Sequence, residues 1–113
     1  MDTIEWTGKS GTDYRFEVYP LGTEFVPLPG VYIFCVLTGG VYKALYVGET
    51  DSLYDRLNAR LDDHDGFERA RAYGVSHVGA MLVDNPTQRL RIEIDLRHGM
   101  NPVCNREAIP ASR

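Results

Sequence analysis

Residues 30–48 read GVYIFCVLTGGVYKALYVG, and this stretch decides the fold. Two segments rich in β-branched and aromatic residues, 31–37 and 41–47, flank the turn signal Thr38-Gly39-Gly40. Such segments favour strands, and strands joined by a short turn usually pair. The stretch therefore predicts a hairpin whose first strand is buried and whose second strand ends at Gly48.

The residues before this hairpin predict another, N-terminal hairpin. Apolar and polar residues alternate over 4–6 and 14–19, and a turn signal over 8–11 separates the two segments. Prolines and glycines then form a rigid connection up to Gly30. We expect residues 1–28 to form a hairpin extension packed on a core domain of residues 29–105.

The residues after Gly48 predict an amphipathic helix. It is expected to begin at an N-cap, Thr50 or Asp51, and to run to about residue 61. Its apolar face is marked by leucines at every fourth position, namely Leu53, Leu57 and Leu61.

The remaining residues predict two helices and a strand. A short helix over 67–73 closes at Gly74, a strand covers 76–83, and a last helix runs from the Asn85 cap to Gly99. The expected fold class is α+β, with a small, mostly antiparallel sheet flanked by helices and preceded by a β-hairpin. Residues 106–113 are expected to be a loose tail.

Composition limits the class of protein. The chain has 113 residues, of which 43% are hydrophobic and 25% charged, which fits one domain with its own core. The longest apolar run is too short to span a bilayer and the N-terminus lacks signal-peptide features, so we expect a cytoplasmic protein without a membrane partner. Cys35 and Cys104 indicate free thiols, because neither has the spacing of a zinc ligand. The net charge of −4 argues against nucleic-acid binding through bulk charge.

Two tyrosines form the first candidate site. Tyr32 and Tyr46 lie on the two paired strands, so we expect their hydroxyls on the same side of the sheet. Gly48 would let the backbone leave the strand and let a ligand approach closely. The alternative is that each tyrosine is half-buried packing.

Three further side chains are candidates near the first helix. Arg56 and Arg60 lie one turn apart beside the leucine stripe, where an arginine either clamps a phosphate or pairs with a carboxylate. His64 lies in an acidic loop, where a histidine is either solvated or transfers protons near neutral pH.

Glu93 stands out on the last helix. At 100° per residue it falls inside the apolar arc, between Leu90 and Leu96. A carboxylate in that position needs a cation. The candidates are Arg89 or Arg97, each four residues away, or a divalent Mg²⁺ or Mn²⁺ ion.

The chain resembles the GIY-YIG nuclease superfamily over residues 29–105. The elements that carry the resemblance occur in the expected order and on the expected helices and strands, namely Gly30-Val31-Tyr32, Tyr46-Val47-Gly48, Arg56, Glu93, Pro102 and Asn105. The N-terminal hairpin resembles an extension found in small members. The resemblance implies a metal-dependent endonuclease that uses Mg²⁺ or Mn²⁺ to hydrolyse phosphodiester bonds of a nucleic acid, with DNA as the expected substrate. The alternative is a module on the same fold that binds nucleic acid or protein without cleaving.

The resemblance also implies a role for each of the five central residues. Tyr46 would accept a proton from the attacking water, Arg56 would hold the phosphate, and Glu93 would bind the metal. Tyr32 would orient Tyr46 or the water, and Asn105 would brace the site or the helix of Glu93.

Some positions are less firmly matched to the family. His64 is similar to a histidine that several members carry after the arginine helix. We expect Gly48, Thr50 and Arg60 to contact the substrate. Several members have lysine where this chain has Glu49, and an anion there would repel phosphate unless it faces away or binds metal.

Overall fold

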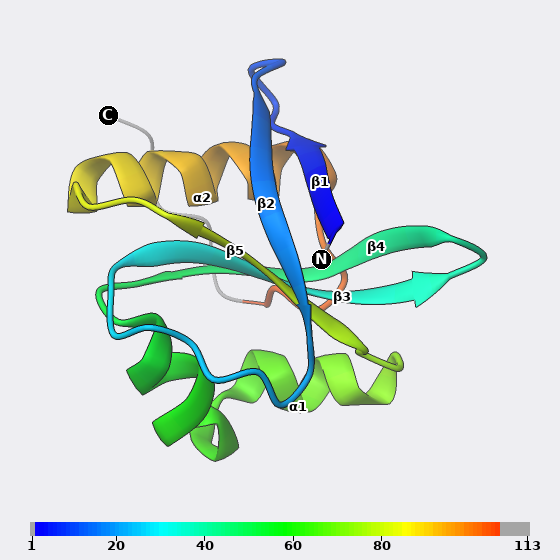
Figure 1. Ribbon diagram of the computed structural model, residues 1–113. Helices are drawn as coiled ribbons and strands as arrows, with labels where there is room; N and C mark the ends of the chain where they lie inside the picture. The colour runs from blue at the N-terminus through cyan, green and yellow to red at the C-terminus, as the bar shows by residue number, and fades with distance from the viewer. Residues whose placement is uncertain (1, 107–113) are drawn as a thin grey trace.

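The hairpin of residues 30–50 lies at one side of a five-stranded sheet (Figure 1). The computed structural model describes residues 2–106, and every strand pair in it is antiparallel. The order across the sheet is β1-β2-β5-β3-β4. The strands are β1 (Asp2–Thr7), β2 (Asp13–Pro20), β3 (Gly30–Thr38), β4 (Val41–Thr50) and β5 (His77–Leu82). The predicted α+β class is confirmed.

Helices cover both faces of the sheet (Figure 1). One face carries α2 (Pro86–Met100), which begins at the predicted Asn85 cap. The other carries the helical turns η1 (Asp55–Ala59) and η2 (Leu61–Asp63), followed by α1 (Asp65–Ala72). Within residues 2–106, no helix is both long and apolar enough to cross a membrane.

The start of the first helical segment differs from the prediction. The Ser52 hydroxyl accepts a hydrogen bond from the amide of Asp55 at 3.2 Å, so Ser52 is the cap rather than Thr50 or Asp51. Thr50 lies two residues before this cap, at the end of β4, where it pairs with Gly30. The helical turn is also wider than an α-helix, with the amide of Arg60 bonded to the carbonyl of Asp55 at 2.9 Å.

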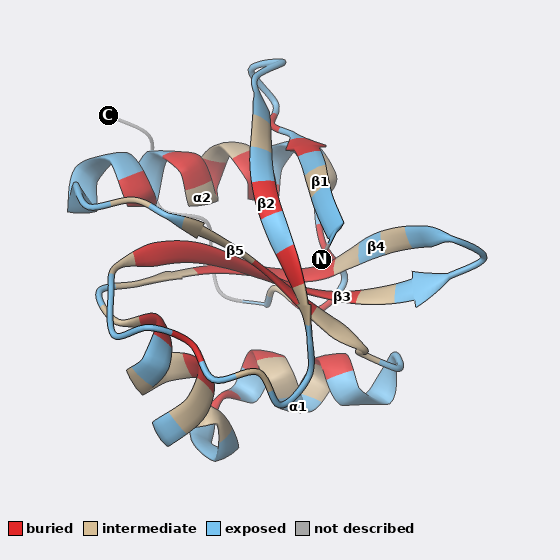
Figure 2. Cartoon of the chain, in the orientation of Figure 1, coloured by how far each residue is buried: buried red, intermediate tan, exposed pale blue. Residues whose placement is uncertain are grey.

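Each face of the sheet has its own apolar core. The core under α2 includes Phe16, Ile33, Val47 and Leu96, and the core under α1 and η1 includes Phe34, Leu45, Leu53 and Leu57. Figure 2 shows that β3 is buried along most of its length, whereas the tip of the β3–β4 hairpin is exposed. Successive side chains of β3 therefore point alternately into the two cores.

The N-terminal hairpin continues the same sheet, because β2 pairs with β5. Its turn is held on α2 by Asp95, whose carboxylate accepts hydrogen bonds from the amide and hydroxyl of Ser10 at 2.9 and 2.7 Å. The hydroxyl of Tyr14 donates to the same carboxylate at 2.7 Å. These bonds lower the pKa of Asp95 even though burial acts in the opposite direction.

Gly48 lies inside β4 and not at its end, where the sequence had predicted it. The strand does not end there but continues to Thr50, and Gly48 lies directly opposite Tyr32. A Cβ atom at Gly48 would lie 2.5 Å from the Tyr32 hydroxyl oxygen, so the phenol fills the space that a side chain would need. Glycine is required here because Tyr32 approaches the backbone closely, not because the chain turns.

We expect Gly48→Ala to lower the free energy of unfolding by about 1–3 kcal/mol, because the new methyl group overlaps the buried Tyr32 ring. Urea denaturation measures this loss. In a Tyr32→Ala background the overlap is gone, so the same Gly48→Ala change should cost much less. An equal cost in both backgrounds would show that the ring is not the cause.

Candidate functional site

Tyr32 and Tyr46 lie side by side on the face of the sheet that α1 covers. Their rings stack with centroids 6.3 Å apart and planes 29° apart, and both belong to the same core. The expectation that the two side chains share one side of the sheet is confirmed.

A β-bulge is what places Tyr46 on this face. Counted from the turn, where Thr38 pairs with Val41, a regular hairpin would set Tyr46 opposite Ile33 and toward α2. The register shifts by one residue between Phe34 and Cys35, so Tyr46 lies opposite Phe34 instead. The sequence analysis predicted the shared face without detecting the bulge that produces it.

His64 lies inside the site and is not solvated. Only 2% of its surface is exposed, and its Nε2 lies 2.7 Å from the Tyr32 hydroxyl. Its Nδ1 accepts a hydrogen bond from the amide of Phe67 at 3.2 Å and so caps α1. Because Nδ1 accepts, we assign the proton to Nε2, which donates to the Tyr32 oxygen. The acidic loop is solvated, but the chain turns inward at His64 to begin α1.

An aromatic wall that sequence analysis missed surrounds these rings. Phe34 lies 5.7 Å from Tyr46, 5.0 Å from His64 and 5.1 Å from Phe67, measured between ring centroids. A Cβ atom at Gly66 would lie 2.5 Å from the Tyr46 ring, so Gly66 makes room for Tyr46 as Gly48 does for Tyr32. The sequence feature that points to this close packing is Gly66 itself, because a glycine in the first turn of a helix is otherwise unfavourable.

Arg56 and Glu93 act on the same tyrosine. Burial raises the pKa of Tyr32 well above its ordinary value, and the neighbouring Tyr46 raises it further. The Arg56 guanidinium opposes this shift through its charge and a hydrogen bond to the Tyr32 side chain, while the charge of Glu93 adds to it. Tyr32 of β3 is therefore influenced by residues from four other places in the chain, namely Tyr46 of β4, Arg56 of η1, His64 at the cap of α1 and Glu93 of α2.

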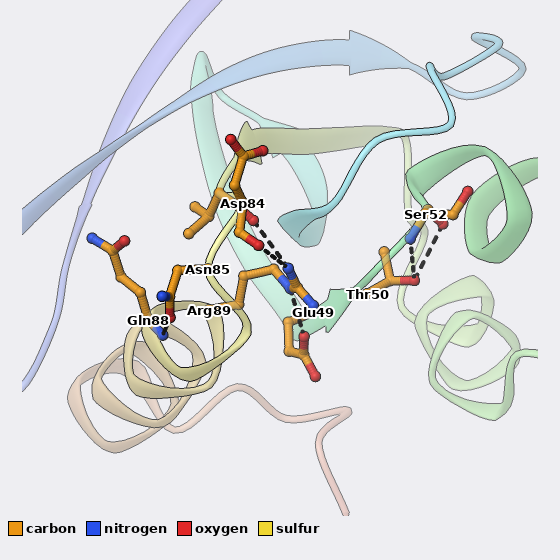
Figure 3. Close-up of polar contacts among 8 residues, drawn as sticks. Glu49, Thr50, Ser52, Asp84, Asn85, Gln88 and Arg89 are labelled. Atoms are coloured by element: carbon orange, nitrogen blue, oxygen red, sulfur yellow. Dashed lines mark hydrogen bonds and ion pairs between the residues drawn. The ribbon is translucent and has the colours of Figure 1, made fainter.

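Arg89 is not the partner of Glu93 among the described residues. Its Nε donates to the Glu49 carboxylate at 3.0 Å, and its Nη1 donates to the carbonyls of Val83 and Asp84 (Figure 3). Glu49 follows Val47 on the α2 face, so it faces away from the two tyrosines. Leu90, expected at the buried arc of the helix, is 38% exposed.

The other predicted site residues bind their own chain. The Asn105 side chain forms two 2.9 Å hydrogen bonds with the backbone of Val47, which ties the C-terminal segment to the free edge of β4. The Thr50 hydroxyl accepts from the amide of Ser52 at 3.2 Å (Figure 3). Arg60 is exposed and pairs with Asp55 at 2.8 Å.

A groove of about 620 Å³ lies away from this region. Apolar and charged side chains of β2, β5 and the β2–β3 connection line it, among them Arg15, Glu17, Glu24, Val26 and Leu82. The residues that line it do not include Tyr32, Tyr46, Arg56, His64, Glu93 or Asn105. The chemistry and this groove therefore occupy different parts of the molecule.

We expect Tyr32→Phe to flatten the loss of stability at alkaline pH. The unfolded chain releases the Tyr32 proton near pH ~10, whereas the folded chain keeps it because its pKa is raised. The stabilisation is therefore complete below pH ~10 and is lost as the pH rises, by about 1.4 kcal/mol at pH ~11. Urea unfolding of both proteins between neutral pH and pH ~11 measures the difference, and parallel curves would contradict the assignment.

We compared the chain with models of known protein families, with curated proteins and with solved structures, and nothing matches it.

Proposed function

We propose that the protein is a cytoplasmic, metal-dependent endonuclease of the GIY-YIG type that hydrolyses phosphodiester bonds in DNA. The observation that carries the proposal is the buried Tyr32 hydroxyl, which lies 2.7 Å from His64 Nε2 and beside the Tyr46 ring, and whose pKa responds to Arg56 and Glu93. A set of two phenols, a guanidinium, an imidazole and a carboxylate exceeds what packing of this core requires. Each type has a use in phosphoryl chemistry.

The two tyrosines have different surroundings, and we assign them different roles for that reason. Tyr32 keeps its proton because burial raises its pKa, so it can orient a partner but cannot accept a proton. Tyr46 is the tyrosine left to act as the general base, since ionising both adjacent phenols would place like charges side by side. His64 holds the Tyr32 oxygen in place from the other side.

Arg56 supplies positive charge to the pair. It lies on η1, and its charge and hydrogen bonding act on Tyr32 by lowering the pKa that burial raises. The guanidinium has five N–H donors, so others remain for phosphate oxygens.

Glu93 fits the metal requirement of such an enzyme. Among residues 2–106 there is no group of three His, Cys, Asp or Glu side chains that could enclose an ion. Mg²⁺ commonly binds one or two carboxylates, with water and substrate phosphate as the other ligands, so one half-buried carboxylate is a sufficient protein contribution. A bound divalent cation would polarise the scissile phosphate and offset its developing charge.

One observation favours a second candidate, a protein-interaction module. The groove beside β2 and β5 is bordered by exposed apolar side chains, including Val26 and Leu82. Exposed apolar surface of this kind is typical of a docking site for another protein. In this alternative the two tyrosines are packing and the protein does not cleave DNA.

We expect the protein to nick supercoiled plasmid DNA with Mg²⁺ or Mn²⁺ present and not in EDTA. Tyr46→Phe should slow nicking by about 10²-fold or more, because it removes the proton acceptor and leaves the ring. Arg71→Ala is the matched control, since Arg71 makes only an exposed contact with Glu68 on α1. Wild-type rates for Tyr46→Phe, or no nicking by the wild type, would refute the proposal and favour the interaction module.

We expect Mn²⁺ to raise the melting temperature of the wild type and not that of Glu93→Gln, because a ligand that binds only the folded state stabilises it. Differential scanning calorimetry with and without the ion measures the shift. Glu68→Gln serves as the control for the loss of an exposed carboxylate. A Glu93→Gln protein that still responds to Mn²⁺ and still cleaves would remove Glu93 from the metal site.

A further inference from the structure

Arg89 is a buried cation held at the junction of β4 and α2. Its side chain is 8% exposed, and its partners are the carboxylate of Glu49 and the carbonyls of Val83 and Asp84. Figure 3 shows the Asp84 carboxylate pointing away from the guanidinium, so Glu49 supplies the negative charge. A buried guanidinium that loses its counter-charge is strongly destabilising unless another carboxylate replaces it.

The replacement nearest along the chain is Glu93. Residues four apart on a helix lie on one face, so Arg89 and Glu93 are neighbours on α2. An ion pair between them would withdraw the charge of Glu93 from Tyr32, on which it acts electrostatically. Glu49 lies on β4 next to Gly48, and it binds Arg89 on the side of α2 that faces the sheet.

We propose that Glu49 is a positioning residue that holds Arg89 and so prevents Arg89 from pairing with Glu93. The proposal rests on the proposed function for its consequence, because it keeps the Glu93 carboxylate at the site where the metal would bind. The anion that replaces the lysine of other family members then has a defined task, and it faces away from the phosphate.

A double-mutant cycle tests this proposal without any activity measurement. We would measure melting temperatures, in EDTA, of the wild type, Glu49→Ala, Glu93→Gln and the double variant. In Glu49→Ala, Arg89 turns to Glu93, so removing Glu93 as well should cost roughly 3–6 °C more than the sum of the single losses. The proposal would be overturned if the double variant lost as much melting temperature as the sum of the two single losses, or less than that sum.

Controls separate this effect from a general loss of stability. Glu68→Ala in place of Glu49→Ala should be additive with Glu93→Gln, since Glu68 lies on α1 and pairs with Arg71. Glu49→Gln, which keeps a hydrogen-bond acceptor but no charge, should give non-additivity of the same sign and smaller size. It also provides the cycle if Glu49→Ala does not fold.

A second readout connects the pair to the metal. In Glu49→Ala, the Mn²⁺ concentration that gives half of the maximal rise in melting temperature should increase about tenfold, because Arg89 competes for the carboxylate. If the wild type neither cleaves nor responds to Mn²⁺, the proposed function fails while the cycle still decides the role of Glu49. If the wild type cleaves and the cycle is additive, only the role of Glu49 is refuted.

Discussion

The close contact between the Tyr32 ring and the bare backbone of Gly48 is the constraint on which the site depends. It requires that these two residues be directly opposite each other, and it leaves the Tyr32 hydroxyl buried at a point that His64 and Arg56 both reach. A side chain at position 48 would push the phenol outward and break both contacts. The arrangement of the site therefore follows from the register of one strand pair.

The last three residues of β4 connect this contact to other segments of the chain. Gly48 receives the Tyr32 ring, Glu49 binds the helix that carries Glu93, and Thr50 bonds to Ser52 at the start of the turn that carries Arg56. Three consecutive residues thus fix three different parts of the site. Such short covalent links reduce the number of ways in which the parts can move relative to one another.

The sequence was sufficient for the fold and for most members of the site, because alternation, leucine spacing and turn residues are local signals. It identified His64 as a candidate but did not predict that His64 is buried, because that burial depends on where the chain turns after η2. The pairing of Arg89 with Glu49 was also missed, since the two residues are 40 positions apart and helical spacing suggested Glu93 instead. The nuclease function stays a prediction, and so do the roles assigned to the two tyrosines.

The bulge opposite Phe34 and Cys35 has a consequence for how this hairpin can change in length. Counted from the turn, a regular pairing would place Tyr46 on the α2 face. The extra residue of the bulge moves Tyr46 to the α1 face. Adding or removing one residue in each strand between the turn and the bulge would keep Tyr46 opposite Phe34 and Gly48 opposite Tyr32. A single-residue deletion in β4 alone would rotate Tyr46 to the α2 face unless the bulge disappeared with it. The match between the two strand lengths, more than the length of either strand, is thus the property that a diverging sequence must conserve in this hairpin.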